Sequence, residues 1–598
     1  MPYGAAGAYR NTQPSGPYMG DGTGDYRSKR KELFAVLSQM EVDRESFTQH
    51  WRDIQDHIRP RAGRFEITDV NRGEKRYNQI LDNTGSVASR VLSSGMHAAM
   101  SSPAQPWYRL GTPYPELNDD WEVRFWLDTV TDRMRSAMQR SNLYQSLPSL
   151  YQDAGDFATG AMLVEKDLEN VAWTRVLPIG SYMVANDPKG RVNTFAREFT
   201  MTIRQVLEEF GERDADGEIT NWENFSLHVK AQYARKHFEH RIDVCHVIAP
   251  NPEHDPGAIE AKYKRFLSCY FERSANAGDR TLRDSGYDLF PVIVARWRVT
   301  GEDSYGTDCP GMMALGDIRQ LQQTEKVALQ ALEKQVNPPL VGGSGLRGVT
   351  VSTIPGHLTL EDAIEGRKGL RPIYEVMPQT GPVEAKQQQV RERINRAYFV
   401  DVFQMLLAMQ DRKLITAREI DAREGERLLA MGPVLEQFNQ DVHDPLIDLY
   451  FAYMLEDGLI PPPPPILEGV TLRVEYISIL AQAQKLAGLG AVDRFGASVA
   501  NMLAYTQNPE ILDNMDPDAQ VRLYAEMTGV PARILRSEDA VKALRDARAR
   551  ANQAAAMMQN IQAAGAAAKD LAAAKTDEPN ALTALLGQTR AGALTRAA

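Results

Sequence analysis

The feature that most constrains the fold is a pair of long polar helices flanking a short insert. Residues 312–336 (MMALGDIRQLQQTEKVALQALEKQV) carry apolar side chains at irregular helical spacing. Asn337-Pro338-Pro339 ends this helix, because proline has no backbone N–H to donate. Residues 340–381 are rich in Gly, Val, Thr and Pro, which predicts a small β or loop module. A second polar helix is predicted over 382–403, opened by a proline where helices tolerate one.

The chain before this unit predicts a mixture of helices and strands. Residues 28–60 carry apolar positions at helical spacing and stop at Pro60. Residues 81–100 combine small and apolar side chains, as in a closely packed buried helix. Between about 160 and 300, short β-rich runs such as AMLVEKD and RIDVCHVIAP predict a sheet. The fold class is therefore predicted as α+β and mainly helical.

The chain after the unit predicts helices interrupted by prolines. Thr416 and Glu419 fit a capping box, so a helix is predicted to start at Thr416. Its continuation to about Leu455 contains Pro433 and Pro445, which predicts two or three pieces separated by kinks.

Composition changes at three further places in the chain. The five consecutive prolines 461–465 predict a polyproline II spacer and a domain boundary. Ser537, followed by two acidic residues, predicts the start of an Ala-rich helix that reaches about Ala574, with a frayed tail behind it. Residues 1–28 lack the basic and apolar regions of a signal peptide and are interpreted as a disordered arm.

Charge and cysteine content exclude several classes of protein. The 68 basic and 79 acidic residues give a net charge of -11, which argues against a protein that grips nucleic acid over its whole surface. Three cysteines without a CxxC pair indicate neither a disulfide framework nor a zinc site, and favour a reducing cytoplasm. No apolar run reaches the roughly 18 to 20 residues that cross a bilayer, so no membrane contact is expected.

The sequence proposes no catalytic centre and no cofactor. It contains no G-x-x-x-x-G-K-[ST], no H-E-x-x-H and no G-x-S-x-G, and its ten histidines are scattered. The glycine-rich run 342–348 has no lysine to reach a phosphate, so a flexible turn is favoured over an anion-binding loop.

One partial metal motif lies in the acidic segment ERDADGE. Glu212, Asp214, Asp216, Gly217 and Glu223 fall at positions 1, 3, 5, 6 and 12 of the calcium-loop spacing. Position 1 is Glu where the motif has Asp, so a solvated acidic turn is favoured over a calcium site.

A basic face lies on the second long helix and on the Met-rich link behind it. One interpretation is a solvated helix surface or a set of inter-subunit salt bridges. The functional interpretation is a thin positive lining along a channel for DNA. The candidate channel residues are Lys386, Arg391, Arg393, Arg396, Gln410, Arg412 and Lys413.

Six segments, taken in this order, resemble the portal or head-to-tail connector proteins of short-tailed bacteriophages. They cover roughly residues 30 to 480. The segments are WRDI with HIRPRAGRF, ILDNTGSVASRVLSSGMHAAMSSPAQPWYRL, SLYQDAGDFATGAMLVEKD, DPKGRVNTFAREFTMTIRQVLEEFG, GMMALGDIRQLQQTEK, and LITAREIDAREGERLLAMGPVLEQFNQDVHDPLID.

The resemblance implies a portal fold that assembles as a ring of probably twelve subunits. Its parts would be a disordered arm (1–28), an α+β wing (29–307), stem helix 1 (308–337), a clip (338–381), stem helix 2 (382–403), a tunnel loop (404–415), wing helices and Pro linker (416–475), a helical crown (476–536), and an Ala-rich C-terminal helix that extends the crown as a barrel, with a frayed tail (537–598).

The resemblance also implies a function that is physical rather than chemical. The ring would form the channel at one capsid vertex of the virion, for DNA packaging, ejection and tail attachment, after assembly in the host cytoplasm. The implied partners are a packaging terminase at the clip, a tail adaptor, the major capsid and scaffolding proteins, and passing double-stranded DNA. Two alternatives remain: another oligomeric virion protein such as a tail adaptor, and a metal-dependent nuclease that uses the acidic loop near Asp214.

Overall fold

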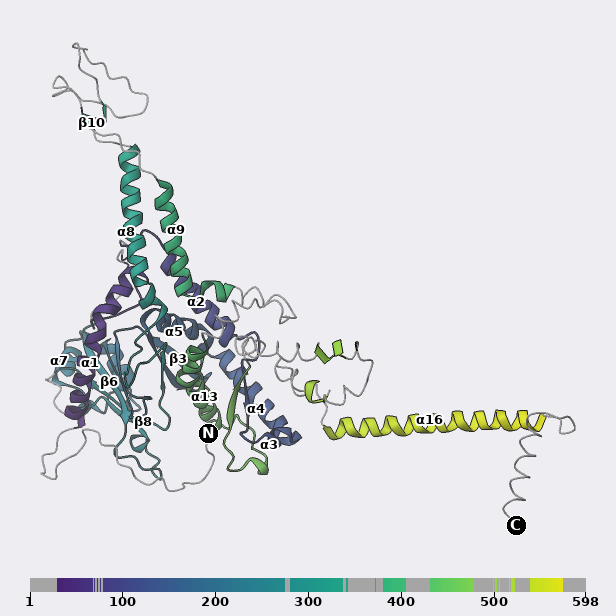
Figure 1. Ribbon diagram of the computed structural model, residues 1–598. Helices are drawn as coiled ribbons and strands as arrows, with labels where there is room; N and C mark the ends of the chain where they lie inside the picture. The colour runs from purple at the N-terminus through teal and green to yellow at the C-terminus, as the bar shows by residue number, and fades with distance from the viewer. Residues whose placement is uncertain are drawn as a thin grey trace, which may run out of the picture. The chain divides into compact units, whose positions relative to one another are not determined.

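The computed structural model describes residues 29–67, 79–274, 280–336, 380–404, 431–477 and 538–573, together with single residues and short pieces between them. The chain divides into two units, 1–516 and 517–598. The first unit contains an α+β body, formed by residues 29–307 and 431–477, and a projecting two-helix hairpin (Figure 1). The predicted class is confirmed as a mixture of helix and sheet in which helix predominates.

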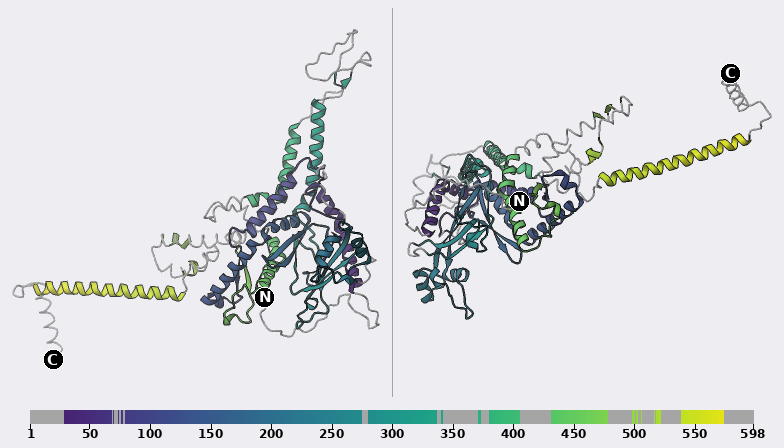
Figure 2. Two further views of the ribbon diagram at one scale, coloured as in Figure 1. Left: turned by 180° about the vertical axis from the view of Figure 1, so that it is seen from behind. Right: turned by 90° about the horizontal axis from the view of Figure 1, so that it is seen from below.

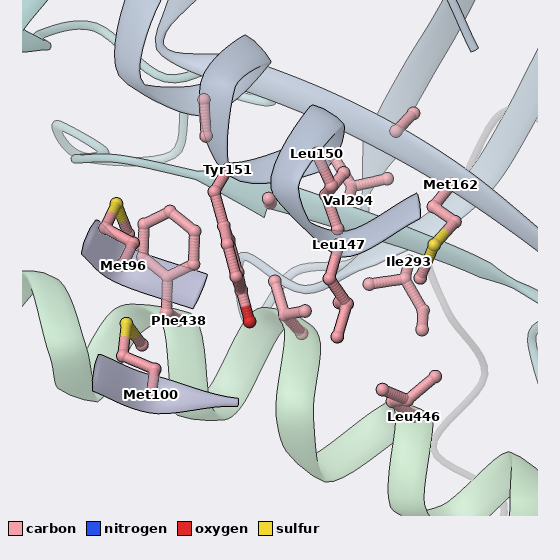
Figure 3. Packing of buried hydrophobic residues seen from close by; sticks show 14 of the residues in the cluster. Met96, Met100, Leu147, Leu150, Tyr151, Met162, Ile293, Val294, Phe438 and Leu446 are labelled. Carbon is pink, nitrogen blue, oxygen red and sulfur yellow. The ribbon is translucent and has the colours of Figure 1, made fainter. Parts of the chain in front are cut away.

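A three-stranded antiparallel sheet lies at the centre of the body. Strand β2 (Thr159–Asp167) pairs with β3 (Val171–Leu177) on one side and with β9 (Val292–Arg296) on the other. Helix α5 (Leu143–Phe157) leads directly into β2 through Ala158, whose φ is 64°. Side chains from α5, the sheet and the neighbouring helices interdigitate in the main core (Figure 3).

A five-stranded antiparallel sheet forms the outer part of the body. Its strands follow one another along the chain: β4 (Tyr182–Asn186), β5 (Val192–Thr202), β6 (Arg241–Pro250), β7 (Phe266–Glu272) and β8 (Arg283–Tyr287). Successive side chains of a strand point to opposite faces, so each face has its own core.

Helices cover both faces of this outer sheet. Helix α1 (Lys29–His57) packs against one face, where Cys245 and Val247 of β6 are buried. Helices α6 (Ile203–Phe210) and α7 (Leu227–Ala234) pack with Val244 in the core of the other face.

The hairpin consists of α8 (Pro310–Val336) and α9 (Thr380–Ala397), which lie side by side and leave the body together (Figures 1 and 2). The helix predicted over 312–336 is confirmed and starts two residues earlier than expected. Beyond it, β10 (Leu340–Val341) pairs with β11 (Arg371–Pro372), and the rest of the predicted insert lies outside the described residues.

The second predicted helix is shorter than expected. It was predicted to continue to Phe403, but α9 ends at Ala397 and helical residues resume only at 400–404. The reason is Phe399, whose φ of 54° lies in the left-handed region and cannot continue a right-handed helix.

The two prolines of the predicted kinked region act differently from each other. Pro433 lies in the first turn of α12 (Gly432–Phe438), where it begins a helix and causes no kink. Pro445 lies at the start of α13 (Asp444–Glu456), directly after a π-helical turn at Asn439–His443. Its ring would clash with the carbonyl group of Asp441 in a regular α-helix, and the wider turn relieves that clash. The predicted start of this region at Thr416 lies outside the described residues.

The proline run 461–465 does not separate two domains, so that prediction is wrong. After it, β12 (Arg473–Tyr476) returns to the body and pairs with β1 (Tyr108–Gly111). The Trp126 indole N–H, from α4 (Trp121–Arg140), donates to the Pro461 carbonyl oxygen at 3.0 Å. The spacer is therefore held against the body by both hydrogen bonding and strand pairing.

The second unit contains α16 (Glu538–Ala573), which confirms the predicted Ala-rich helix. Arg545 of this helix forms an ion pair with Asp518. None of the helices described in either unit combines the length and the apolarity that a bilayer span needs.

Candidate functional site

The two helices of the hairpin meet through a narrow apolar seam near the body. The buried residues of this seam are Leu315, Ile318 and Leu321 of α8, and Val390 and Ile394 of α9. Outside the seam the surface of α9 is mainly polar, whereas α8 also exposes apolar side chains at Met313, Val327, Leu329, Leu332 and Val336.

Glycines on α2 (Thr84–Met100) let the hairpin approach the body closely. A Cβ atom at Gly85 would lie 2.7 Å from the Cδ1 atom of Ile318 on α8. A Cβ atom at Gly95 would overlap the ring of Phe403, which follows α9. The closely packed helix predicted over 81–100 is therefore confirmed, and its small residues contact both arms of the hairpin.

The structure separates the predicted channel residues into two groups. Arg391 donates to Asp82 at 3.0 Å and to Glu325 at 2.6 Å, and Arg393 donates to Asp317 at 2.7 Å. These two guanidinium groups hold α9 against α8 and the body.

The remaining candidates are placed differently. Lys386 and Arg396 are exposed and form no ion pair with any residue of the described part of the chain. Gln410, Arg412 and Lys413 lie outside the described residues.

A short segment before α2 joins the hairpin to the body. The Gln322 side chain on α8 accepts hydrogen bonds from the backbone N–H groups of Leu81 and Asp82, at 2.6 and 2.9 Å. Burial alone would raise the pKa of Asp82, but hydrogen bonds from Thr84 and Arg391 outweigh it and hold the pKa below its usual value. Asp82 therefore stays ionised opposite Arg391.

Charge reversal is expected to distinguish the two groups of basic residues. Arg391→Glu should lower the free energy of unfolding by about 2–3 kcal/mol, because it removes charged hydrogen bonds and places a third carboxylate beside Asp82 and Glu325. Lys386→Glu, on the same helix and exposed, is the matched control and should change it by less than about 0.5 kcal/mol. Urea denaturation measures both, and equal losses would contradict the pairing.

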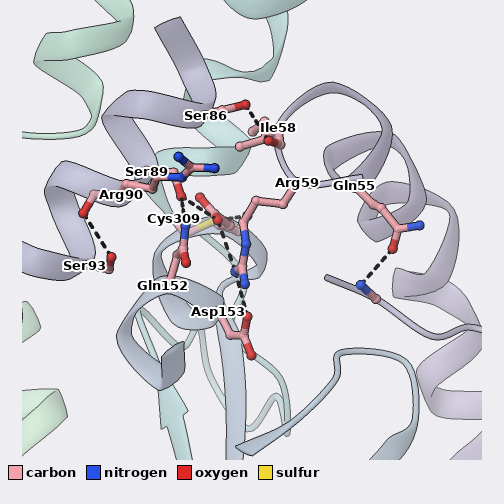
Figure 4. A network of polar contacts seen from close by, with 12 residues as sticks. Gln55, Ile58, Arg59, Ser86, Ser89, Arg90, Ser93, Gln152, Asp153 and Cys309 are labelled. Carbon is pink, nitrogen blue, oxygen red and sulfur yellow. Dashed lines mark hydrogen bonds and ion pairs between the residues drawn. The ribbon is translucent and has the colours of Figure 1, made fainter. Parts of the chain in front are cut away.

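A buried polar network lies where the hairpin enters the body (Figure 4). Arg59 forms ion pairs with Asp153 at 2.7 Å and with Asp156 at 3.3 Å. The Asp156 carboxylate also accepts hydrogen bonds from the hydroxyl groups of Ser89, at 2.7 Å, and Tyr398, at 3.1 Å. One fully buried carboxylate on α5 thus connects α2, the segment after α1 and the end of the hairpin.

Burial shifts the proton affinities of this network. It raises the pKa of Asp153 to about 6 against the opposing attraction of Arg59, and it raises the pKa of Asp156 as well. One cation beside two carboxyl groups leaves excess negative charge in the core when both are ionised. The network therefore takes up a proton more readily than exposed carboxylates do.

The π-helical turn carries a second buried polar chain. His443 accepts from or donates to the Tyr151 hydroxyl group at 2.9 Å, and that hydroxyl group contacts Ser101 at 2.9 Å. Burial lowers the pKa of His443 to about 3, so the imidazole stays neutral. Arg296, also buried, pairs with Asp441 of the same turn at 2.9 Å.

Stability is expected to fall on mild acidification through His443. Its folded pKa of about 3 lies below that of an unfolded histidine, so the unfolded chain binds the extra proton and the stability is lost as the pH falls below about 6.5. Between pH 7 and pH 5 the loss is about 2 kcal/mol. Asp153 has the opposite effect on stability. Because its pKa is raised in the folded state, the folded chain binds this proton at a higher pH than the unfolded chain does, and acidification stabilises it.

Urea denaturation at pH 7 and pH 5 checks this expectation. His443→Gln removes the titrating group and should reduce the pH-dependent loss by about 2 kcal/mol relative to the unsubstituted chain. His254→Gln, at an exposed position of the same body, is the control and should leave it unchanged. An unaltered pH dependence in His443→Gln would show that His443 does not titrate in this way.

The calcium-loop candidate is a turn. The Asp214 carboxylate accepts hydrogen bonds from the backbone N–H groups of Asp216 and Glu218, and Gly217 has a φ of 82°. Glu223 lies in a separate 3₁₀ turn, Trp222–Asn224. Within the described ranges, no three His, Cys, Asp or Glu side chains form a group that could hold a metal ion. In the structure these acidic residues thus form a hydrogen-bonded turn, with Glu223 in a separate turn.

Comparison with known proteins identifies the class. The chain matches the family described as bacteriophage head to tail connecting protein over residues 30–535. It is 41% identical over 558 residues to the portal protein of Salmonella phage epsilon15, which covers 93% of this chain and 98% of that protein. It is 39% identical over 557 residues to the probable portal protein of Bordetella phage BPP-1, with the same coverage.

The chain belongs to the bacteriophage head-to-tail connecting protein family. Its function is that of a phage portal protein, and as such it is a component of the virion.

Proposed function

We propose that twelve copies of this chain form a ring around an open channel at one capsid vertex, through which DNA enters and leaves the head. The observation that carries this proposal is the hairpin of α8 and α9, which projects from the body (Figure 1) and exposes apolar side chains of α8 at Val327, Leu329 and Leu332. A ring needs an interface between two different faces of the same chain, and a projecting hairpin offers one face on each helix.

The parts of the chain are assigned accordingly. The α+β region 29–307 is the wing, 308–337 and 382–403 contain the stem helices α8 and α9, and 338–381 is the clip. The other parts are the tunnel loop at 404–415, the wing helices with the proline run at 416–475, the crown at 476–536 and the C-terminal helix with its tail at 537–598. The two-stranded pairing of β10 with β11 at the far end of the hairpin supports a compact clip.

The channel guides DNA through weak electrostatic interactions. Twelve copies at a net charge of -11 sum to about -130, so the ring as a whole repels DNA. This repulsion prevents tight phosphate contacts that would stall a moving duplex, while a few positive rings centre it. Lys386 and Arg396 are the described candidates for these rings, because Arg391 and Arg393 are already paired within the chain.

The ring performs no covalent chemistry in this proposal. The sequence carries no phosphate-binding loop of the P-loop type. A separate packaging terminase therefore supplies the energy for DNA packaging, and it docks at the clip. The other partners in this proposal are a tail adaptor and the major capsid and scaffolding proteins.

Negative-stain electron microscopy and native mass measurement of the purified chain test the proposal. Rings with an open axial hole and a mass of twelve chains are expected. A monomer in every condition, or an oligomer with a closed centre, would overturn it and favour a tail adaptor. The double variant Lys386→Glu, Arg396→Glu should form the same rings but package less DNA in an infection assay, and unchanged packaging would remove these two residues from the channel.

A further inference from the structure

Two imidazole rings meet beside helix α7, at the outer edge of the body (Figure 1). The Nε2 atom of His228, in the first turn of α7, lies 3.1 Å from the Nε2 atom of His240, which directly precedes β6. The ring centroids are 5.1 Å apart and the ring planes are inclined by 61°, so the rings meet through these nitrogen atoms and do not stack. Both side chains are exposed, so a solute can reach the two nitrogen atoms from the solvent.

A tight reversal of the chain after α7 brings the two histidines together. Lys236 ends the helix with a φ of 60°, and the His237 N–H group donates to the Gln232 carbonyl oxygen at 3.0 Å, as in a Schellman motif. His240 is held at the start of the outer sheet, because its carbonyl oxygen accepts from the Ile203 N–H group at 2.9 Å. The other histidine belongs to the helix itself. Secondary structure therefore holds both backbones, and this keeps the two imidazoles within reach of each other.

Two neutral imidazoles in this arrangement can share either a proton or a metal ion. Nitrogen atoms bound to one metal ion at about 2.0–2.1 Å lie about 2.9 Å apart when the two bonds are at a right angle and about 3.3 Å apart when they are tetrahedral. The separation of 3.1 Å between the two Nε2 atoms lies between these values. When a metal ion replaces the shared proton, that proton moves to Nδ1 of the same ring, so each imidazole stays neutral and offers the Nε2 lone pair that a metal ion needs.

The charge of the surrounding chain favours a cation over an anion. Residues 204–243, which form α6, the acidic turn, α7 and the start of β6, contain nine acidic and six basic side chains, a net charge of -3. This surplus attracts cations of every kind, so the ligand atoms decide which ion is held. Imidazole nitrogen suits Zn²⁺, Cu²⁺ and Ni²⁺, whereas Mg²⁺ and Ca²⁺ prefer oxygen ligands. The pair therefore selects transition metals.

We propose that His228 and His240 bind one divalent transition-metal ion through their Nε2 atoms, with water in the remaining coordination positions. Among the described residues no third His, Cys, Asp or Glu side chain joins the pair, so the ion is held less tightly than in the four-ligand sites of structural zinc. The bound ion joins α7 to the start of β6 across a separation of 12 residues in the sequence. The site does not depend on the proposed function, because both ligands come from one chain.

Calorimetric titration of the purified full-length chain, without an affinity tag, tests the site with the chlorides of Cu²⁺, Ni²⁺, Mn²⁺ and Mg²⁺. Affinity should fall in the order Cu²⁺, Ni²⁺, Mn²⁺, and Mg²⁺ should give no heat of binding. His228→Gln and His240→Gln should each weaken Ni²⁺ binding by at least about tenfold, since even the loss of a residue that only supports a ligand costs that much. His254→Gln, at an exposed position elsewhere on the body, is the control and should leave Ni²⁺ binding unchanged.

Hydrogen exchange on the unsubstituted chain locates the bound ion and keeps the test decisive if a variant disturbs the fold. With Ni²⁺ at about ten times its Kd, backbone exchange over residues 227–241 should slow by about tenfold, because opening of this segment requires release of the ion. Exchange over residues 310–322 of the hairpin should not change. Ni²⁺ binding that does not protect 227–241, or protection that persists in His240→Gln, would overturn the site. If the protection appears but the chains form no open rings, the metal site stands and the proposed function falls.

Discussion

Replacing Arg59 with methionine is expected to lower the free energy of unfolding of the body by about 3–5 kcal/mol at pH 7. The substitution removes the cation that Asp153 and Asp156 share at 2.7 and 3.3 Å and leaves two carboxyl groups in a site from which water is excluded. The aliphatic part of the side chain is kept, so the loss reports on charge more than on volume.

Two comparisons make the Arg59 result specific. Arg204→Met breaks the exposed pair with Glu239 and should cost less than about 1 kcal/mol, because exposed pairs are screened by water. The loss in Arg59→Met should also shrink at pH 5, since the raised pKa of Asp153, about 6, allows it to become neutral there. A loss equal to that of Arg204→Met, measured by urea denaturation, would show that the network does not depend on Arg59.

Replacing Gly311 with alanine is expected to destabilise the chain by about 2–3 kcal/mol, the upper part of the range for overpacking, because the groups it meets cannot move aside. The new methyl group would overlap the backbone of Asp156, and a backbone atom in a buried helix has little room to shift. The start of α8 would have to move away from α5, so the attachment of the hairpin should weaken as well.

A second glycine of the same helix provides the control for Gly311. Gly316 faces open space, because no atom of another described segment lies within 4 Å of the position that a methyl group would take. Gly316→Ala should therefore stabilise the helix by about 0.5–1 kcal/mol through its higher helix propensity. Thermal unfolding of the two variants should shift in opposite directions. Destabilisation by both, or by neither, would contradict the close approach of α8 to Asp156.

The parts of the fold that could be predicted from the sequence are those encoded locally. The helix at 312–336, the small-residue helix at 81–100 and the Ala-rich helix after Ser537 each carry their signal in consecutive residues, and the structure contains all three. The close packing of α2 was also predictable, because glycine and other small residues in a helix allow neighbouring helices to approach closely.

The parts that could not be predicted depend on contacts between distant segments. The network around Asp156 joins residues 59, 89, 153, 309 and 398, and no local pattern indicates that these side chains meet. Its one local signal is the pair of acidic residues in the otherwise apolar segment LYQDAGDF, where a buried carboxylate needs a partner.

The pairing of the basic residues on α9 could not be predicted from the sequence either. The sequence presents Arg391 and Arg393 as members of one stripe with Lys386 and Arg396, but only the fold reveals that Asp82 and Asp317 lie opposite the first two. The early end of α9 is similar, since phenylalanine gives no warning of a left-handed conformation at position 399.

The most direct test of the central claim is a cryo-electron microscopy map of the assembled chain, fitted with the body and the hairpin. We expect a closed ring in which α8 and α9 of every copy surround an open axial channel, with Lys386 and Arg396 on the channel side of α9. A ring whose hairpins point outward, or whose centre is filled by the body, would contradict the account.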